Sequence, residues 1–279
     1  MDKELKIAIQ GVRGSFHHEA SQYVFGNDIS LLECTTFSDV TESTVKRDAD
    51  YGVMAIENSL AGCIIPNYNL LRQSGLEVCG EVGIRVKLNL LALDGESIEG
   101  LDEVHSHQMA LRQCGSFLNT ISDKRIVEAF DTAGSARHIL ENNLRGVGAI
   151  AGNLAASEHG LNVLAAGIED HKMNYTRFLV LKKEDADPLA GEANKMSIYF
   201  QTKHSPGSLA QLLSVISGLG INLSKLQSHP VPSKNSLYGF FATLDLEALD
   251  QIKHLEILLE AMTIDYQILG VYKKGETHG

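Results

Sequence analysis

The chain has 279 residues, of which 44% are hydrophobic and 21% charged, a composition typical of a folded globular protein. Its 24 Lys and Arg residues against 35 Asp and Glu residues leave a formal net charge of -11. This charge, and the lack of a basic patch interleaved with aromatic residues, argue against nucleic acid and anionic membranes as partners. No apolar run approaches the ~18 residues of a membrane span, and the first residues lack a secretory pattern, so we expect a cytoplasmic protein.

Short apolar runs alternate with helical patterns over the first two thirds of the chain. This alternation is typical of an α/β domain with a largely parallel sheet. The pattern leaves open whether the strands form one sheet or two small lobes that share a cleft. Strands are predicted at residues 5–10, 51–56, 86–93, 125–129, 147–151 and 178–181, and helices at 16–25, 109–118, 133–144 and 152–159.

A charged segment with Pro and Gly but no apolar periodicity, residues 184–194, is interpreted as a linker between a domain at 1–183 and another at 195–279. After it, the order of the predicted elements is βαββαβ, that of a ferredoxin-like module. The strands are predicted at residues 196–202, 221–226, 238–244 and 266–272, and the helices at 209–216 and 255–262.

A glycine turn, Gly11 to Gly14, follows the first predicted strand, and Ser15 precedes the first predicted helix. Free backbone N–H groups and the helix dipole favour an anion at such a place. A tight turn capped by Ser15 explains the same residues, so both interpretations stay open.

Small polar side chains end the predicted strand 51–56, where Glu57, Asn58 and Ser59 follow it. Ligands of open α/β sheets bind at the carboxyl ends of strands, so these residues are candidates for a site. A solvated turn with helix caps is the alternative.

Ser106 lies where a strand is expected to meet a helix, between His105 and His107. The two histidines share one strand face, but a third ligand at matching spacing is missing, so no metal site is expected. The four cysteines, Cys34, Cys63, Cys79 and Cys114, form no C-x-x-C pair and are interpreted as reduced thiols.

Asn174 and Thr176 would lie on one face of an extended strand, with Tyr175 and Arg177 on the other. An edge strand with a surface arginine is the alternative. Motifs typical of serine hydrolases, zincins and P-loop NTPases are absent from the sequence.

Taken in order, these segments resemble the prephenate dehydratase family, in its monofunctional form with a C-terminal regulatory ACT domain. The resemblance extends over essentially the whole chain, and Thr176-Arg177-Phe178 is its most specific part. It departs from the family at Val12 and Gln108, where proline is usual. The segments that carry it are residues 11–16, 55–59, 106–114, 131–133, 155–161 and 174–178.

The resemblance implies a two-lobed α/β catalytic domain, similar to periplasmic binding proteins, that converts prephenate to phenylpyruvate in phenylalanine biosynthesis without a cofactor. It implies Thr176 as the general acid toward the departing hydroxyl, and Asn58, Ser106 and Gln113 as further catalytic groups that orient the ring and carboxylates. Arg177 or the N–H groups near Gly14 and Ser15 would hold the anionic groups, although Arg177 reaches the cleft only if the strand bends. The full set of expected substrate-binding residues is Gly14, Ser15, Glu57, Ser59, Asn174, Arg177 and Phe178.

The C-terminal module resembles an ACT domain that senses L-phenylalanine, which implies feedback inhibition and a homodimer or homotetramer. The family's Glu-Ser-Arg-Pro motif reads Gln-Ser-His-Pro here, so a carboxylate and a guanidinium are replaced. The expected effector-binding residues are Gly207, Ser208, Leu209, Asn222, Leu223, Gln227, Ser228, His229 and Pro230.

Two other functions are compatible with these patterns. Arogenate dehydratases share the motifs and differ by an amino group in the substrate. A non-catalytic sensor of small acids would combine a binding-protein-like cleft with an amino-acid-sensing module. The combination of Asn58, Ser106, Gln113 and Thr176 argues against the sensor, because simple binding does not require that set.

Overall fold

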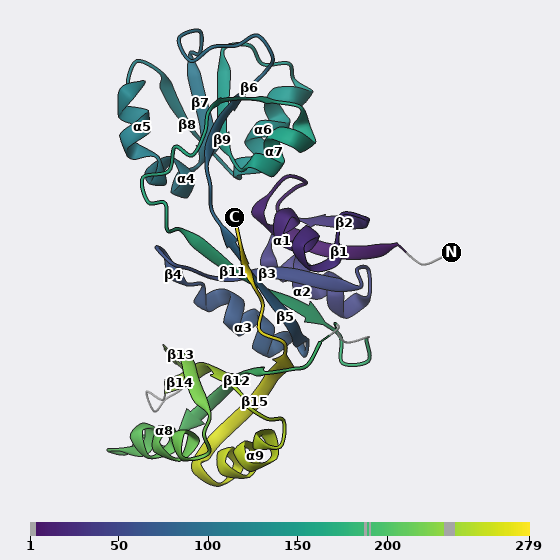
Figure 1. Cartoon of the computed structure of the whole chain (residues 1–279), viewed down its shortest axis with the longest axis vertical. Coiled ribbons are helices and arrows are strands. Elements are labelled where there is room, and N and C mark those ends of the chain that lie inside the picture. Colours follow the sequence, from purple (N-terminus) through teal and green to yellow (C-terminus); the bar gives the residue numbers. More distant parts are fainter. Residues whose placement is uncertain (1–3, 187–188, 190, 232–237) are drawn as a thin grey trace.

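The computed structural model describes residues 4–186, 189, 191–231 and 238–279. Three units follow one another along the long axis of the molecule (Figure 1). A lobe with a 7-stranded sheet lies in the middle, a lobe with a 5-stranded sheet lies at one end, and a module with a 4-stranded sheet lies at the other. Within these described ranges, no helix is long and apolar enough to cross a membrane.

The first lobe has the strand order β16-β5-β11-β3-β1-β2, with β4 paired to β3. β1 pairs in parallel with β2 and β3, whereas β11 runs antiparallel between β3 and β5. The strands are β1 (Leu5–Gln10), β2 (Ile29–Cys34), β3 (Tyr51–Asn58), β4 (Gly62–Cys63), β5 (Glu77–Arg85), β11 (Tyr175–Lys182) and β16 (Thr277–His278), and the helices are α1 (Phe16–Phe25), α2 (Phe37–Lys46) and α3 (Ile65–Ser74).

The second lobe is formed by the chain between β5 and β11, in the strand order β10-β6-β9-β7-β8. The sequence pattern did not decide between one sheet and two lobes, and the structure has two lobes, each with its own sheet. The strands are β6 (Asn89–Ala92), β7 (Glu103–His107), β8 (Arg125–Ala129), β9 (Val147–Ala151) and β10 (Asn162–Ala165), and the helices are α4 (Gln108–Gln113), α5 (Gly115–Thr120), α6 (Thr132–Glu141) and α7 (Asn153–His159).

Two chain segments, residues 86–88 and 166–174, connect the lobes and are hydrogen-bonded to each other. The Val86 N–H donates to the Asn174 carbonyl at 2.8 Å, and the Leu88 N–H donates to the Glu169 carboxylate at 2.9 Å. Residues 86–88 were predicted as the start of a strand, but they form this connection, and the strand begins at Asn89. The predicted helix 109–118 is likewise divided at Cys114 into α4 and α5.

The C-terminal module has the strand order β13-β14-β12-β15 with antiparallel pairing throughout, as expected for a ferredoxin-like fold. Apolar residues of its two helices pack on one face of the sheet. The predicted linker 184–194 includes residues 187, 188 and 190, which lie outside the described residues. The elements are β12 (Lys195–Thr202), α8 (Ser208–Gly218), β13 (Asn222–Pro230), β14 (Tyr238–Asp245), α9 (Gln251–Met262) and β15 (Thr263–Tyr272).

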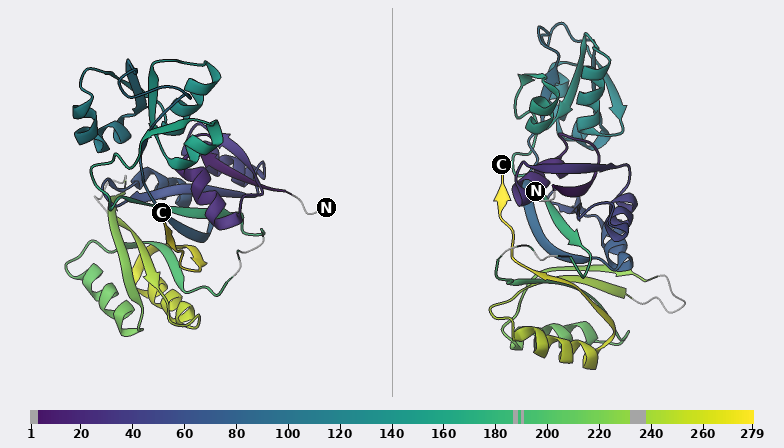
Figure 2. Two further views of the ribbon diagram at one scale, coloured as in Figure 1. Left: turned by 45° about the horizontal axis from the view of Figure 1, so that its top comes forward. Right: turned by 90° about the vertical axis from the view of Figure 1, so that its right-hand side faces the viewer.

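The segment after β15 leaves this module and runs along the first lobe, as Figure 2 shows from the side. There β16 pairs in parallel with β5, and the Gly83 N–H donates to the Glu276 carbonyl at 2.9 Å. The His278 ring stacks on Tyr23 of α1 at 4.0 Å between centroids. Residues that the sequence assigned to the C-terminal domain thus extend the sheet of the first lobe.

Candidate active site

A cavity of about 240 Å³ lies between the two lobes. The first lobe contributes the glycine turn, the start of α1 and the inward-facing residues of β3 and β11. The second lobe contributes the end of β7 and the start of α6. The lining residues are Gln10, Gly11, Ser15, Phe16, His17, Ala55, Thr176 and Phe178 from the first lobe, and His107, Phe130, Asp131 and Thr132 from the second.

The lobes meet closely beside this cavity at the glycine turn. Gly14 has a φ of +86°, and a β-carbon there would stand 2.8 Å from the Cα of Ala155 in α7. Arg13 forms an ion pair with Glu158 across the same contact, at 3.1 Å. A side chain at Gly14 would therefore force the lobes apart as well as strain the backbone.

Asn58, at the end of β3, faces Thr176 on β11. The Asn58 Oδ1 atom accepts from the backbone N–H groups of Leu60 and Ala61, both at 2.9 Å. Since backbone N–H groups are always donors, the amide nitrogen must lie at the other end of the side chain. That nitrogen lies 3.0 Å from Thr176 Oγ1 and donates to it. The Thr176 hydroxyl proton therefore points elsewhere and remains available to another acceptor.

Asn174 extends this network across the connection between the lobes. Its Oδ1 atom accepts from Asn58 Nδ2 at 2.7 Å, and its own Nδ2 donates to Gln113 Oε1 of α4 at 3.2 Å. Asn174 is fully buried, and its backbone carbonyl accepts a hydrogen bond from the Val86 N–H of the other connecting segment. Thr176, Asn58 and Gln113, three of the predicted catalytic residues, are thus linked through Asn174.

Other predicted residues are engaged elsewhere. The Ser106 side chain is fully buried and donates to the Ile150 carbonyl at 2.6 Å. The Gly14 N–H donates to His18 Nδ1, and the Ser15 N–H donates to the Val12 carbonyl, both at 3.0 Å. These two N–H groups are therefore already bonded within the turn, which differs from the expectation that they hold an anion. Ser59 ties β3 to β11, since its hydroxyl accepts from the Tyr175 N–H at 2.9 Å.

His17 is a cavity residue that the sequence did not single out. Its Nε2 atom accepts from the Ala55 N–H at 3.3 Å, and its ring meets Phe178 edge-on at 4.9 Å. Burial lowers the pKa of the His17 imidazole to about 3, so the ring is neutral at physiological pH. The signal in the sequence was the pair His17-His18 in the first turn of a helix, where both prove to be buried.

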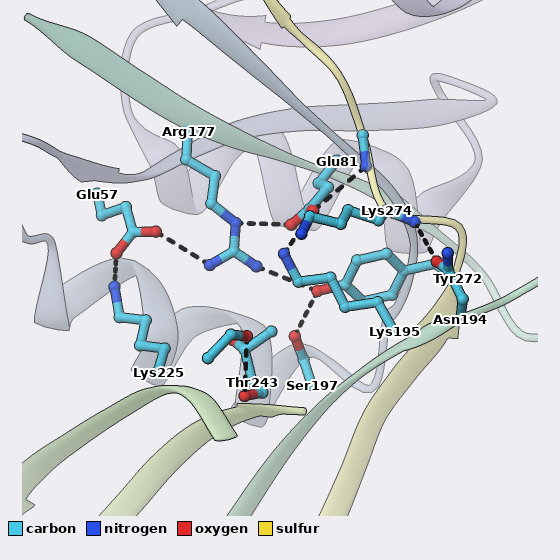
Figure 3. A network of polar contacts seen from close by, with 12 residues as sticks. Glu57, Glu81, Arg177, Asn194, Lys195, Ser197, Lys225, Thr243, Tyr272 and Lys274 are labelled. Atoms are coloured by element: carbon cyan, nitrogen blue, oxygen red, sulfur yellow. Dashed lines mark hydrogen bonds and ion pairs between the residues drawn. The ribbon is translucent and has the colours of Figure 1, made fainter. Parts of the chain in front are cut away.

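Arg177 points away from the cavity into a network of charged residues, because it follows Thr176 on the strand and lies on the opposite face (Figure 3). It donates to Glu81 at 2.7 Å, to Glu57 at 3.0 Å and to the Tyr272 hydroxyl at 3.1 Å. The predictions that Arg177 and Glu57 bind substrate in the cleft therefore disagree with this geometry, in which the two side chains bind each other.

The same network connects the first lobe to the C-terminal module (Figure 3). Lys195 of β12 donates to Glu81 at 2.6 Å, and Lys225 of β13 forms an ion pair with Glu57. A second cavity of about 410 Å³ adjoins these groups and is also lined by Thr176 and Asn58. Thr176 thus lies between the interlobe cavity and the junction with the C-terminal module.

The two histidines on either side of Ser106, for which no metal site was expected, form local contacts. His105 bonds to Glu103 at 2.8 Å, and His107 accepts from the Met109 N–H at the start of α4. Among the residues that the structure describes, no group of three or more His, Cys, Asp or Glu side chains is placed to hold a metal ion.

Comparison with known proteins identifies the family. The family model described as prephenate dehydratase matches residues 7–186, which include the second lobe and nearly all of the first lobe except its C-terminal strand β16. The chain belongs to the prephenate dehydratase family. Prephenate dehydratases are decarboxylating hydro-lyases of phenylalanine biosynthesis.

Similarity to whole proteins extends beyond the dehydratase region. The bifunctional chorismate mutase/prephenate dehydratase of Aquifex aeolicus is 35% identical over 278 residues, covering 98% of this chain and 75% of that protein. The chloroplastic arogenate dehydratase/prephenate dehydratase 2 of Arabidopsis thaliana is 35% identical over 279 residues, covering 96% of this chain and 72% of that protein.

Two solved structures share the fold over nearly the whole chain. The prephenate dehydratase of Arthrobacter aurescens, in complex with L-Phe, is 25% identical with a TM-score of 0.84, covering 96% of this chain and 90% of that one. A protein described as a novel type of quorum quenching acylase is 29% identical with a TM-score of 0.85, covering 96% of this chain and 98% of that one.

The residues expected to bind an effector lie in different parts of the C-terminal module. Gly207, Ser208 and Leu209 line a cavity of about 590 Å³ between the end of β12 and the start of α8. His229 is buried instead at the junction with the first lobe, where its ring stacks on Phe241 at 5.0 Å. The remaining residues lie along β13, namely Asn222, Leu223, Gln227, Ser228 and Pro230.

Proposed function

We propose that the cavity between the lobes is where prephenate undergoes decarboxylative dehydration to phenylpyruvate, with Thr176 as the proton donor. The observation that carries this assignment is the hydrogen bond from Asn58 Nδ2 to Thr176 Oγ1. Because Asn58 occupies a lone pair of this oxygen, the hydroxyl proton is free to point at the substrate, and Thr176 itself lines the cavity.

The proposed step is one elimination. The bond between the ring and its carboxylate breaks, carbon dioxide leaves, and the electron pair enters the ring as the opposite C–O bond breaks. The departing hydroxide takes the Thr176 proton and leaves as water, and the threonine is reprotonated from solvent. Aromatisation drives the reaction, so hydrogen bonds held in place are sufficient catalytic help. The Asn58 N–H stabilises the negative charge that develops on Thr176 Oγ1.

The other catalytic assignments follow from position. Gln113 would act through Asn174, whose amide nitrogen donates to it, because Gln113 itself is not among the residues that line the cavity. Ser15 and Phe178 would form the wall of the cavity. Ser106 would act through the β7–β9 pairing, because its hydroxyl is bonded to Ile150.

The structural similarity to an acylase raises a second function, cleavage of an acyl amide. Such a reaction needs a hydroxyl activated by an adjacent base. Thr176 Oγ1 has an amide N–H donor beside it instead, which cannot accept a proton. This contact favours proton donation by Thr176, and therefore the lyase reaction.

The decisive experiment is to follow phenylpyruvate formation from prephenate by the purified protein. Chorismate and an N-acyl amino acid amide serve as parallel substrates, because they report mutase and acylase activity. Formation of phenylpyruvate without conversion of the other two supports a monofunctional dehydratase. Absence of phenylpyruvate would overturn the proposal.

We also propose that the C-terminal module is an ACT domain that binds L-phenylalanine and inhibits the enzyme, in a homodimer or homotetramer. Its βαββαβ order and the Gly207-Ser208-Leu209 turn at a cavity support this assignment, as does the L-Phe complex of the similar Arthrobacter protein. Arg177 would connect effector binding in this module to the active site, because it is adjacent to Thr176 and bonded to Tyr272 of β15.

Regulation is tested by measuring activity and molecular mass with and without L-phenylalanine. We expect inhibition together with a change in hydrodynamic size, corresponding to a coupling of about 1 to 3 kcal/mol. Gly207→Ala should raise the L-phenylalanine concentration required, because Gly207 has a φ of +83° at the cavity edge. If L-phenylalanine alters neither activity nor size, the regulatory proposal fails while the catalytic one stands.

A further inference from the structure

A carboxylate faces the interlobe cavity from the second lobe. Asp131 caps α6, and its Oδ1 atom accepts from the Gly134 N–H at 3.0 Å. Its Oδ2 atom lies on the cleft side, 3.6 Å from where a β-carbon on Gly11 of the first lobe would stand. Among the described residues, Oδ2 has no hydrogen-bond donor, so it remains free to accept from a bound molecule.

The cavity offers this carboxylate no fixed cation. None of the described residues that line it is a lysine or an arginine. His17 does not supply a charge, because it is buried and its Nε2 atom accepts from the backbone. Arg177 follows the cavity residue Thr176 in the sequence, but its side chain lies on the opposite face of the strand and binds Glu57 and Glu81.

The relatives include proteins named for two substrates, prephenate and arogenate. These molecules differ in one group of the side chain, which is an α-keto group in prephenate and an α-ammonium group in arogenate. An ammonium group donates three hydrogen bonds and carries a positive charge, so it complements a free carboxylate oxygen. A keto oxygen can only accept, and beside Asp131 it would be repelled.

We propose that Asp131 is a specificity-determining residue that makes the cleft favour the α-amino form of the substrate over the α-keto form. The inference rests on the proposed dehydratase activity of the same cavity. Thr176 and Asn58 act on the ring end of the substrate, whereas Asp131 binds the ammonium group of its side chain. Both substrates can react, but arogenate has the higher kcat/KM.

The test is the ratio of kcat/KM for arogenate to kcat/KM for prephenate, in the wild-type protein and in Asp131→Asn. Asparagine is also a good helix cap, so the variant retains the contact with Gly134 and should fold. Asp131→Ser is a second variant that can cap the helix without a charge. Asp39→Asn is the control, because Asp39 belongs to the capping box of α2, away from the cavity.

We expect a wild-type ratio above one that falls at least about 10-fold in both Asp131 variants and stays unchanged in Asp39→Asn. Most of the fall should come from arogenate, with prephenate turnover kept or improved. A ratio that Asp131→Asn and Asp131→Ser leave unchanged would overturn the inference and leave the proposed function intact. Turnover of neither substrate by the wild-type protein would overturn both.

Discussion

The amide nitrogen of Asn58 lies 3.0 Å from the hydroxyl oxygen of Thr176, with its direction set by two backbone donors at the opposite end of the amide. This contact makes Thr176 a proton donor whose oxygen is stabilised as it becomes negative. Thr176→Ala should lower kcat by about 100-fold or more and change KM by only a few-fold, since the lost interaction is formed in the transition state.

The matched control for this variant is Thr176→Ser, which keeps the hydroxyl and should retain kcat within about 10-fold of wild type. Steady-state kinetics on both variants decide the matter. A near-normal kcat in Thr176→Ala would remove Thr176 from the mechanism.

Asn58→Asp distinguishes the accepting role of the Asn58 amide oxygen from the donating role of its nitrogen. A carboxylate can still accept from Leu60 and Ala61, but it can no longer donate to Thr176 or to Asn174. We expect kcat to fall by about 100-fold, since one donor to a developing oxyanion has about that effect. Circular dichroism should show the fold retained, and unchanged kcat would contradict the role assigned to this amide.

The pH dependence of stability should carry a contribution from His17. Burial lowers the pKa of this imidazole from 6.5 to about 3, so the unfolded chain binds a proton below pH 6.5 that the folded protein does not. Folding stability is therefore lost as the pH falls from 6.5 toward 3, by about 2 kcal/mol between pH 7 and pH 5.

Urea unfolding of wild type and His17→Gln at both pH values measures this contribution by difference. Glutamine can accept from the Ala55 N–H but does not titrate, so the variant should lose about 2 kcal/mol less on acidification. Equal losses in the two proteins would show that His17 is protonated in the folded state.

Removal of Arg177 should destabilise the junction with the C-terminal module. Arg177→Met leaves Glu81, whose side chain is only 6% exposed, without one of its two cations. We expect the free energy of unfolding to fall by about 3 kcal/mol. Lys46→Met is the control, because the Lys46–Glu42 pair is exposed at 63% and 58% and should matter by less than about 0.5 kcal/mol.

A side chain at Gly14 should impair catalysis by separating the lobes. Gly14→Ala places a methyl group 2.8 Å from the Ala155 Cα, so we expect kcat/KM to fall by about 10-fold or more. Gly75→Ala has a similar backbone penalty at φ +70° but open space around the new methyl group. Gly75→Ala should lower thermal stability and leave kcat/KM unchanged. If Gly14→Ala and Gly75→Ala had the same effect on kcat/KM, the lobe contact at Gly14 would be unimportant for catalysis.

Local patterns in the sequence predicted the parts of the site that depend on one strand. Alternation placed Asn174, just before β11, and Thr176 on one side of the chain and Arg177 on the other. The structure agrees, since Asn174 and Thr176 both bond to Asn58 while Arg177 bonds to Glu57. The partners of Arg177 could not be predicted. Glu81 and Tyr272 lie far from it in the sequence, and only the tertiary fold brings them together.

The apolar pattern also does not predict β5, because Gly80 and Gly83 are unusual within a strand. The structure gives the reason. A β-carbon on Gly80 would stand 2.8 Å from Leu189, and one on Gly83 would stand 2.7 Å from Thr277. Both glycines leave space for residues that come about 100 or more positions later in the sequence, Leu189 and Thr277. The helix α2 was not predicted either, although its capping box of Thr36 and Asp39 is a signal that the sequence contains.

The position of β11 has a consequence for synthesis on the ribosome. β3 and β5 leave the ribosome early, but the strand that joins them follows only after the whole second lobe has been made. Until then both strands have unpaired edges, which are prone to pair with other chains. The second lobe, continuous in sequence, can fold while the first one waits. We therefore expect nascent chains that stop before β11 to require chaperones, and chains that include it to be released from them.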